Sequence, residues 1–451
     1  MRLSLVGADF EENLGLGMIA ATAQQAGHSV VVHPFNDVRQ AREVARRIAS
    51  ARPELVGLSL QFQHRGHEFV ALARALREAG YRGHLTCGGM LASAAWQQVL
   101  AEKAFDSVVL YEGEQTIVEL AGALVAGRPL AEVPGLALRD ERGEAVRTAD
   151  RERPSDLDAL PFPTRYRPPT RHLGIPFLPV LGSRGCWGRC TFCSISSFHL
   201  EASAHGGGQL FRRRSPENIA QEMALLAGDG PALFCFHDDN FLLPNPKHSL
   251  KRVQEIRAAF DELAPGPLGI IGKTRPECLT AELAKELREL GVVRLYVGVE
   301  NTSETGAEHL ARGTQTRHVH SALAACREAG IFACYNLLVF EPKTTLADVK
   351  QNVAFMREPA APRPTPVPRC TARVPRATRS PAAGWAGTTG SRTTGPSCSS
   401  ASARPPSASA TSAPTASPTG RWAWATAAGS SSTSTRRRPP RRRSSRAAPR
   451  T

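Results

Sequence analysis

The first 130 residues alternate between short apolar runs and longer segments with helical periodicity. The apolar runs span 2–6, 29–33, 55–60, 84–87 and 107–110. Between them, 15–27, 38–51, 68–80 and 93–103 place apolar residues at helical spacing, as at Phe69, Leu72 and Leu76. Strict alternation of strands and helices predicts a doubly wound α/β domain over 1–135, whose parallel sheet binds ligands at the carboxyl ends of its strands.

The same alternation resumes near residue 176 and predicts a second domain over 173–358. Strands are expected at 176–181, 232–236, 268–272, 292–299 and 331–340, and helices at 281–290, 318–329 and 346–356. A further helix should begin after Ser215, which can cap it, with Pro216 in its first turn. Five βα units in a row predict a barrel-like parallel sheet with its site at the strand ends. Residues 136–172 should form a hairpin, turning at 140–143, and a proline-punctuated linker.

Polar and glycine-rich points in the first domain fall where its strands end. Because the carboxyl ends of parallel strands share one edge of the sheet, these residues should gather around one ligand. They are Asn13, Gly15, Ser59, Gly88, Gly89, Glu112 and Gly113.

Three cysteines follow the first strand of the second domain. Cys186, Cys190 and Cys193 have the spacing C-x3-C-x2-C, and Phe192 precedes the last of them. Thiolates are soft ligands that suit iron–sulfur clusters and zinc. Three of them can hold three corners of a cubane cluster and leave the fourth iron open. The alternative is a zinc knuckle that takes His199 as its fourth ligand.

This loop resembles the signature of radical S-adenosylmethionine (SAM) enzymes. The resemblance implies a partial (β/α)6 barrel and a [4Fe–4S] cluster whose open iron chelates SAM. One electron then cleaves SAM to methionine and a 5′-deoxyadenosyl radical. By the same resemblance Glu300 and Arg312 are expected to be catalytic, and Phe192 and Asp239 to bind cofactor. The polar residues expected to face the cluster and SAM are Asp238, Asp239, Lys273, Arg275, Glu300 and Asn336.

The strand ends of the first domain, upstream of this loop, resemble the cobalamin-binding domain of cobalamin-dependent radical SAM proteins. One departure concerns the D-x-H-x-x-G motif, whose histidine ligates cobalt in many cobalamin proteins. The equivalent loop runs from Asp9 through Glu11 and Glu12 to Gly15 and has no histidine. His28 and His33 flank a strand and are expected to be structural. Cobalamin is therefore expected without that histidine, and the alternative is a degenerate domain that holds no cofactor.

The combined resemblance implies C-methylation of an unactivated carbon, with cobalamin as the methyl donor. A radical SAM oxidative cyclase of the porphyrin-cyclase type is the alternative enzyme. The expected substrate is a small molecule or a peptide-derived group, and the expected electron donor is a flavodoxin or ferredoxin.

The net charge of +15 suggests a nucleic-acid partner until the charge is located. Residues 359–451 hold 16 arginines and no lysine, aspartate or glutamate. Without them, 1–358 has 40 basic and 41 acidic residues, a net charge of −1. No nucleic-acid partner is therefore expected for the two domains.

Residues 359–451 consist of only nine residue types, chiefly Ala, Arg, Ser, Pro and Thr. Every residue except Val367 and Val374 has G or C as the middle base of its codons. A GC-rich gene read out of frame produces this pattern, so we interpret the tail as the product of a frameshift between about 356 and 362. The alternative is a genuine disordered, Arg-rich tail that binds nucleic acid or an acidic surface.

A frameshift would remove the sixth barrel strand and leave an open sheet edge. A third interpretation of the chain is therefore an inactive, frameshifted remnant.

Several absences suggest a cytoplasmic setting. No run of about 18 apolar residues predicts a membrane span. No signal peptide is visible at the start, and the ten cysteines do not form a secreted disulfide framework. A reducing compartment would also protect an oxygen-labile cluster.

Overall fold

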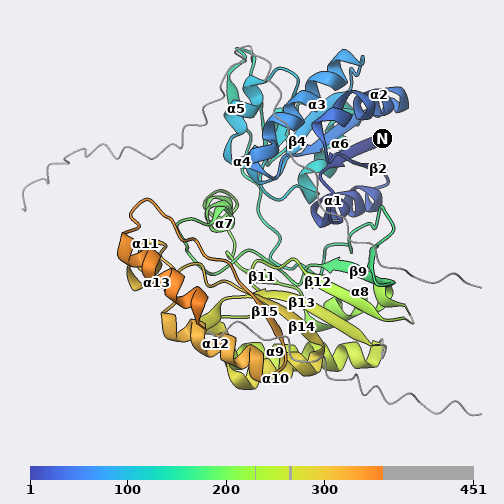
Figure 1. The fold of residues 1–451 in the computed structure, drawn as a ribbon. Coiled ribbons are helices and arrows are strands. Elements are labelled where there is room, and N and C mark those ends of the chain that lie inside the picture. The colour runs from blue at the N-terminus through green and yellow to red at the C-terminus, as the bar shows by residue number, and fades with distance from the viewer. Residues whose placement is uncertain (229, 264–266, 359–451) are drawn as a thin grey trace, which may run out of the picture. The chain divides into compact units, whose positions relative to one another are not determined.

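The computed structural model describes residues 1–228, 230–263 and 267–358, which form two α/β domains, each with its own sheet (Figure 1). The predicted tail, 359–451, and the expected position of the sixth barrel strand lie outside the described residues. Within the described residues, no helix is long and apolar enough to cross a membrane.

The first domain has a seven-stranded sheet in the order β2-β1-β3-β4-β5-β6-β7. The strands are β1 (Arg2–Gly7), β2 (Ser29–Pro34), β3 (Leu55–Ser59), β4 (His84–Gly88), β5 (Ser107–Val109), β6 (Leu136–Arg139) and β7 (Ala145–Arg147). The first five are parallel, and β6 and β7 add an antiparallel hairpin at one edge. The doubly wound domain and the hairpin are both confirmed.

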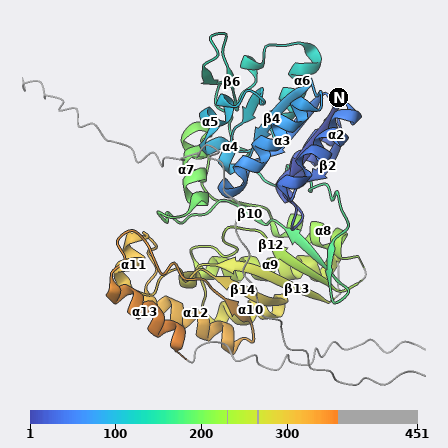
Figure 2. The ribbon, with the colours of Figure 1, turned by 45° about the horizontal axis from the view of Figure 1, so that its top comes forward.

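Helices cover both faces of this sheet (Figure 2). On one face α1 (Leu14–Gln25) and α6 (Glu114–Ala126) bury Ala20 and Leu120 against β1 and β5. The other face is covered by α2 (Ala41–Ala51), α3 (Gly66–Glu78), α4 (Met90–Ala94) and α5 (Trp96–Ala101). Short 3-10 turns occur at η1 (Val38–Gln40), η2 (Gln63–Arg65) and η3 (Leu130–Glu132). The single helix predicted over 93–103 is two helices, because the backbone leaves the helical conformation at Ala95, where φ is −124°.

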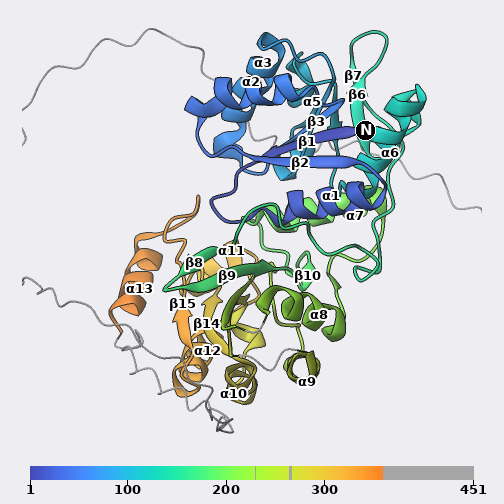
Figure 3. The same cartoon turned by 90° about the vertical axis from the view of Figure 1, so that its right-hand side faces the viewer.

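The second domain has a six-stranded sheet in the order β15-β14-β13-β12-β9-β8, and Figure 3 shows β8 beside β9. The strands are β8 (Thr170–His172), β9 (Ile175–Val180), β12 (Ala232–Phe236), β13 (Leu268–Thr274), β14 (Val292–Val297) and β15 (Phe332–Cys334). Five strands are parallel, as predicted, and β8 pairs antiparallel with β9 at the edge. The strand predicted over 331–340 is much shorter, since beyond Cys334 the ladder continues only as an isolated bridge from Leu337 to Glu300.

Helices α8 (Pro216–Ala227), α9 (Pro246–Leu263), α10 (Ala281–Leu290) and α12 (Thr316–Glu328) pack on one face of this sheet. Ile219, Val253, Leu283 and Val319 contribute one buried side chain from each helix to the shared core. The predicted cap of α8 is confirmed, because Ser215 Oγ accepts a hydrogen bond from the backbone of its third residue at 3.0 Å. The remaining elements are α7 (Ser194–Gly206), α11 (Glu304–His309), α13 (Leu346–Arg357), η4 (Pro276–Cys278), β10 (Ser183–Arg184) and β11 (Arg212–Arg213).

The two sheets extend past the domain boundaries expected from the sequence. The hairpin β6–β7 pairs with β5 and so belongs to the first sheet, although it lies after residue 135. Strand β8 precedes residue 173 but pairs with β9 in the second sheet. The linker proper is therefore the segment between β7 and β8.

Candidate active site

The three cysteines lie on one loop between β10 and α7. Cys190 is buried, Cys186 and Cys193 are half-buried, and all three thiols are free. Cys193 is the N-cap residue of α7 and so stands at the partially positive N-terminus of that helix. Burial raises the pKa of the Cys186 thiol, and the Gly188 N–H, 3.3 Å from its sulfur, acts in the opposite direction. One short segment thus presents three soft ligands.

Two arginines that are distant in sequence reach the middle cysteine. Arg275, which follows β13, donates from Nη1 to Cys190 Sγ at 3.1 Å, and Arg312 Nη1 lies 3.7 Å from the same sulfur. The Arg275 guanidinium also stacks over the Trp187 ring, 4.8 Å from its centroid. The two guanidinium groups thus place positive charge beside the sulfur of Cys190. The donor set and its charge compensation fit an anionic iron–sulfur cluster.

Glu300 and Arg312, both predicted to be catalytic, lie beside Gly298, directly after β14. A Cβ built on Gly298 would lie 3.4 Å from both Glu300 Oε1 and Arg312 Nη2. Glu300 is buried in a left-handed conformation, with φ of 62°, and its Oε2 has no hydrogen-bond partner among the described residues. Burial raises the pKa of Glu300, although Arg312 acts to lower it. A buried carboxylate oxygen without a donor fits a cationic ligand group, such as the amino group of SAM.

A cavity of about 650 Å³ follows the carboxyl ends of the parallel strands of the first domain. Eight of the nine residues predicted to bind cofactors line it, namely Asn13, Gly15, Ser59, Gly88, Gly89, Glu112, Gly113 and Asp239. Phe192 is not among its lining residues, and its ring is 41% exposed. Arg184 and Gly185, which lead into the cysteine loop, also line the cavity. One cavity is therefore bounded by the ligand edge of the first sheet and by the start of the cysteine loop.

Glycines keep this edge of the sheet open for a ligand. Gly89 has φ of 101°, and a Cβ there would meet the Leu60 carbonyl oxygen at 2.9 Å. A Cβ on Gly88 would lie 3.3 Å from the Val109 carbonyl oxygen. No larger residue fits at Gly89 without moving the backbone, so the β4 loop can approach a bulky cofactor closely.

Two of the predicted cofactor-binding side chains have other partners. Asn13 caps α1, because its Oδ1 accepts from Leu16 N at 3.1 Å and its Nδ2 donates to Ala8 O at 3.1 Å. Glu112 forms ion pairs with Arg184, at 2.8 Å, and with Arg212. Both residues line the cavity, but their polar atoms shape the protein around it.

The paired aspartates after β12 differ in role. Asp238 accepts hydrogen bonds from Gly182 N at 2.8 Å and from the Ser183 hydroxyl, so it joins the ends of β12 and β9 rather than facing a cofactor. Asp239 lines the cavity, and burial raises its pKa to about 6. Its Oδ2 lies 3.8 Å from His199 Nε2.

His199, the fourth ligand of the alternative zinc knuckle, lies beside Asp239, with its Nε2 3.8 Å from Asp239 Oδ2. Two further residues were predicted to face the cluster and SAM. Lys273 is exposed. The backbone oxygen of Asn336 accepts a hydrogen bond from Glu300 N at 3.1 Å.

The loop in place of the cobalt-ligating motif is held by residues that no sequence pattern singled out. Arg167 Nη1 donates to Asp9 O at 2.7 Å, Arg165 pairs with Glu12 at 3.0 Å, and His237 Nε2 lies 3.1 Å from Glu11 Oε2.

The expected structural role of His33 agrees with its hydrogen-bond contact to Ser4 Oγ at 3.2 Å. The histidines that line the cavity, His199 and His237, come from the second domain.

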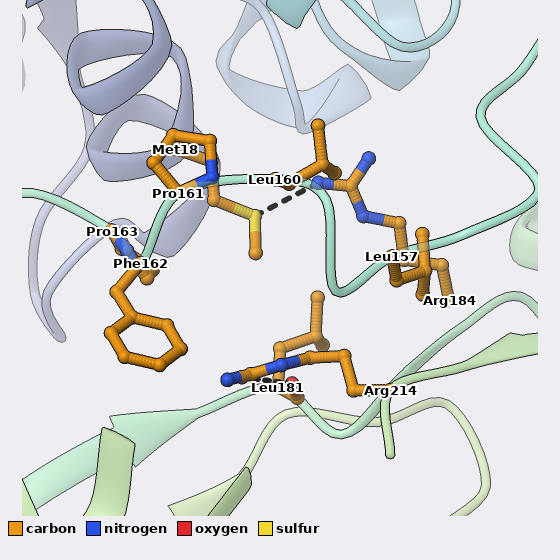
Figure 4. Close-up of a pocket in the computed structure, with 9 residues that line it drawn as sticks. All are labelled: Met18, Leu157, Leu160, Pro161, Phe162, Pro163, Leu181, Arg184 and Arg214. Atoms are coloured by element: carbon orange, nitrogen blue, oxygen red, sulfur yellow. Dashed lines mark hydrogen bonds between the residues drawn. The ribbon is translucent and has the colours of Figure 1, made fainter. Parts of the chain in front are cut away.

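The linker also packs beside Arg184 (Figure 4). Figure 4 shows Met18, Leu160 and Phe162 around a small apolar pocket, with Arg184 and Arg214 at its sides. Arg184 Nη2 donates to Met18 Sδ at 2.9 Å, and Arg214 lies over the Phe162 ring, 5.2 Å from its centroid.

Comparisons with known protein families agree with this division. Residues 6–121 match the B12 binding domain, and residues 180–356 match the radical SAM superfamily. An uncharacterized methyltransferase from Pyrococcus horikoshii is 24% identical over 350 residues, which cover 76% of this chain and 73% of that protein. The anaerobic magnesium-protoporphyrin IX monomethyl ester cyclase of Synechocystis is 27% identical over 337 residues, or 71% of this chain and 63% of the cyclase.

Solved structures share the fold of both domains. The radical SAM methyltransferase TsrM from Kitasatospora setae superposes with a TM-score of 0.64 at 21% identity, over 79% of this chain and 71% of TsrM. The cobalamin-dependent SAM radical enzyme OxsB superposes with a TM-score of 0.64 at 19% identity, over 78% of this chain and 51% of OxsB. At these identities the likeness establishes the shared architecture.

The fold and the cysteine loop define a cofactor-dependent enzyme with two joined α/β domains. A radical SAM domain is found at residues 180–356, and a B12-binding domain at residues 6–121.

Proposed function

We propose that this protein is a cobalamin-dependent radical SAM methyltransferase that methylates an unactivated carbon of a small-molecule or peptide-derived substrate. One observation carries the proposal: a single cavity is lined both by the glycine-rich strand ends of the B12-binding domain and by Arg184 and Gly185 at the start of the cysteine loop. Chemistry that needs both cofactors requires them to share one enclosed space.

We propose that each cofactor is held by residues of the two domains that were predicted from the sequence. Cys186, Cys190 and Cys193 would ligate the [4Fe–4S] cluster, and Glu300 would receive the amino group of SAM. Cobalamin would lie along the strand ends that include Gly15, Ser59, Gly88, Gly89 and Gly113. When bound, the cluster supplies the electron that cleaves SAM, and cobalamin carries the methyl group.

The chain's own residues contribute charge, position and exclusion of water. Arg275 and Arg312 offset negative charge at Cys190 Sγ, at 3.1 and 3.7 Å. Glu300 is held beside Arg312 with one oxygen free, so that it can orient a cationic group against the cysteine loop. Apolar side chains such as Leu58, Val109 and Phe198 line much of the cavity and keep water away from a radical.

Names of related proteins favour methyl transfer. Besides the Pyrococcus protein, a cytidylyl-2-hydroxyethylphosphonate methyltransferase from Streptomyces wedmorensis is 24% identical over 302 residues, which cover 54% of that protein. TsrM was solved with tryptophan and a SAM analogue, and OxsB with cobalamin and SAM.

We also propose a flavodoxin or ferredoxin as electron donor and a cytoplasmic location, since the cluster requires a reductant and a reducing setting.

The Synechocystis cyclase supports a second candidate, oxidative ring formation, because it is 27% identical over 337 residues. The two reactions differ in what happens to the methyl group of SAM. Methylation transfers a labelled methyl group from SAM to the product, whereas oxidative cyclisation leaves the product unlabelled.

Anaerobic reconstitution of the full chain with iron, sulfide and hydroxocobalamin tests the proposal. We expect about four irons per chain, a bound corrin spectrum, and reductant-dependent release of 5′-deoxyadenosine from SAM. The variant in which Cys186, Cys190 and Cys193 are changed to Ala should lose the iron, while Cys326→Ala, in the core of the second domain, should keep it. A chain that binds both cofactors but never yields 5′-deoxyadenosine would be the inactive remnant.

A further inference from the structure

The five parallel strands of the second sheet contain only two charged residues, and both are cationic. The sequences of β9, β12, β13, β14 and β15 include Lys273 and Arg294 but no aspartate or glutamate. A charged residue inside a barrel strand is costly unless it faces solvent or a ligand. Both cations are exposed, so solvent or a ligand can meet their charge.

Both cations lie on the face of the sheet opposite α8, α9, α10 and α12, which we call the inner face. Residues Ile270 and Leu295, on the other face, are buried in the core beneath those helices. Side chains alternate along a strand, so Lys273 and Arg294, which directly precede the buried residues Thr274 and Leu295, point to the inner face. Lys273 and Arg294 are both exposed, although the alternation of burial in β14 is interrupted at Val293, where the register with β13 shifts.

Strand register brings the two cations into adjacent rows. Lys273 is paired with Tyr296, and Ile271 with Arg294. Tyr296 is in turn paired with Cys334. Paired residues of parallel strands point to the same face, so Lys273, Tyr296 and Cys334 form one row and Arg294 lies in the next.

The Arg294 guanidinium is fixed in place without being neutralised. Its Nε donates to Cys334 Sγ at 2.9 Å, and its carbon lies over the Phe332 ring, 5.9 Å from the centroid. Neither Arg294 nor Lys273 has a carboxylate within 4.0 Å among the described residues. The described part of the inner face thus holds two full positive charges, one of them pre-oriented.

This face leads directly into the cofactor site. Lys273 is two residues before Arg275, which donates to Cys190 Sγ at 3.1 Å. The charge of Lys273 also acts on Asp239, which lines the cavity. Asp239 and Glu300, the carboxylates expected to contact SAM, follow the neighbouring strands β12 and β14. A ligand on the inner face would therefore meet cations on one side and the cofactors on the other.

We propose that Lys273 and Arg294 bind an anionic group of the substrate, a carboxylate or a phosphate, with Tyr296 as an additional hydrogen-bond donor. The assignment of this ligand as substrate rests on the proposed function. A planar guanidinium and an ammonium on neighbouring rows match the oxygens of either anion. Each charge-assisted contact should contribute about tenfold to affinity.

The test titrates sodium pyrophosphate and sodium succinate separately into the full chain at low ionic strength, with calorimetric detection. The double variant Lys273→Gln/Arg294→Gln is compared with Lys285→Gln/Arg327→Gln, which removes two exposed cations from α10 and α12 on the other face. Both variants lose the same net charge, and any anion binding by the Arg-rich residues after 358 is common to all the proteins. The anion that binds more tightly, pyrophosphate or succinate, shows whether the site prefers a phosphate or a carboxylate.

We expect saturable binding of one anion to the unaltered chain and to the control variant, and at least tenfold weaker binding to Lys273→Gln/Arg294→Gln. Alkylation of Cys334 provides a local readout, because an anion that engages Arg294 should slow the reaction of the adjacent thiol. Equal affinities in all three proteins, or no change in Cys334 alkylation at saturation, would overturn the proposal. Anion binding is measured without iron or cobalamin, so failure of cofactor binding contradicts the proposed function and leaves this inference standing.

Discussion

Arg184 Nη1 lies 2.8 Å from Glu112 Oε2 and so connects the cysteine loop to the ligand edge of the B12-binding domain. Arg184 also pairs with Glu114, and Glu112 pairs with Arg212. Burial alone would raise the pKa of Glu112, but the two arginines hold it below its ordinary value. Because Arg184 stands two residues before Cys186, this network fixes the cysteine loop against the strand ends at which cobalamin is proposed to bind.

Changing Arg184 to Gln should destabilise the protein strongly. Two nearly buried carboxylates, Glu112 and Glu114, would lose a shared cation, and breaking a buried pair from one side costs about 3–5 kcal/mol. Urea unfolding of the cofactor-free chain measures the loss. As a control, Arg2→Gln removes a pair of similar length, 2.7 Å, that is exposed to solvent, and its unfolding midpoint should not move measurably. Equal effects of the two substitutions would show that the Arg184 network does not hold the domains together.

Two glycine substitutions should have opposite effects. Gly89→Ala introduces a Cβ at φ of 101°, only 2.9 Å from the Leu60 carbonyl oxygen, so it should cost about 1–3 kcal/mol and weaken cobalamin binding. Gly122→Ala, within α6, meets no atom within 4 Å and should stabilise the chain by about 0.5–1 kcal/mol. Thermal unfolding and titration with hydroxocobalamin measure both. Unchanged cobalamin affinity in Gly89→Ala would contradict a corrin site at this loop.

The ends of strands and helices could be predicted because the local sequence pattern determines them. The partners of charged residues could not be predicted. The boundaries of β12 and α10 match the predicted ranges, since each is bounded by clear polar or glycine residues. Glu112, predicted to bind cofactor, lines the cavity, but its partner Arg212 lies 100 residues further along the chain. No local signal identifies such a pair, because it forms only when two domains meet. The fifth strand was overestimated because apolar residues continue to Phe340 after its backbone pairing has ended.

His33 should make the stability of the first domain depend on pH. Burial, assisted by the charge of Arg47, lowers its pKa to about 4 from an ordinary value of 6.5. The unfolded chain therefore binds the proton more readily than the native chain, and the native state should lose stability as pH falls from about 6.5 to 4. The loss should approach roughly 3 kcal/mol. His33→Gln should reduce this dependence, measured by urea unfolding across that range, while His67→Gln, at an exposed position on α3, should retain it.

Glu300→Gln should separate stability from SAM binding. Burial raises the pKa of Glu300, so the ionised carboxylate costs stability at neutral pH, and that cost is relieved as pH falls through the raised value. The neutral amide removes the cost, so the cofactor-free variant should be at least as stable as the unaltered chain at pH 7. Its affinity for SAM should fall about tenfold or more, because a charge-assisted contact to the amino group is lost. Equilibrium dialysis with radiolabelled SAM measures the affinity, and Glu308→Gln, exposed on α11, should change neither property. If Glu300→Gln binds SAM as tightly as the unaltered chain, the free oxygen of Glu300 does not receive the amino group.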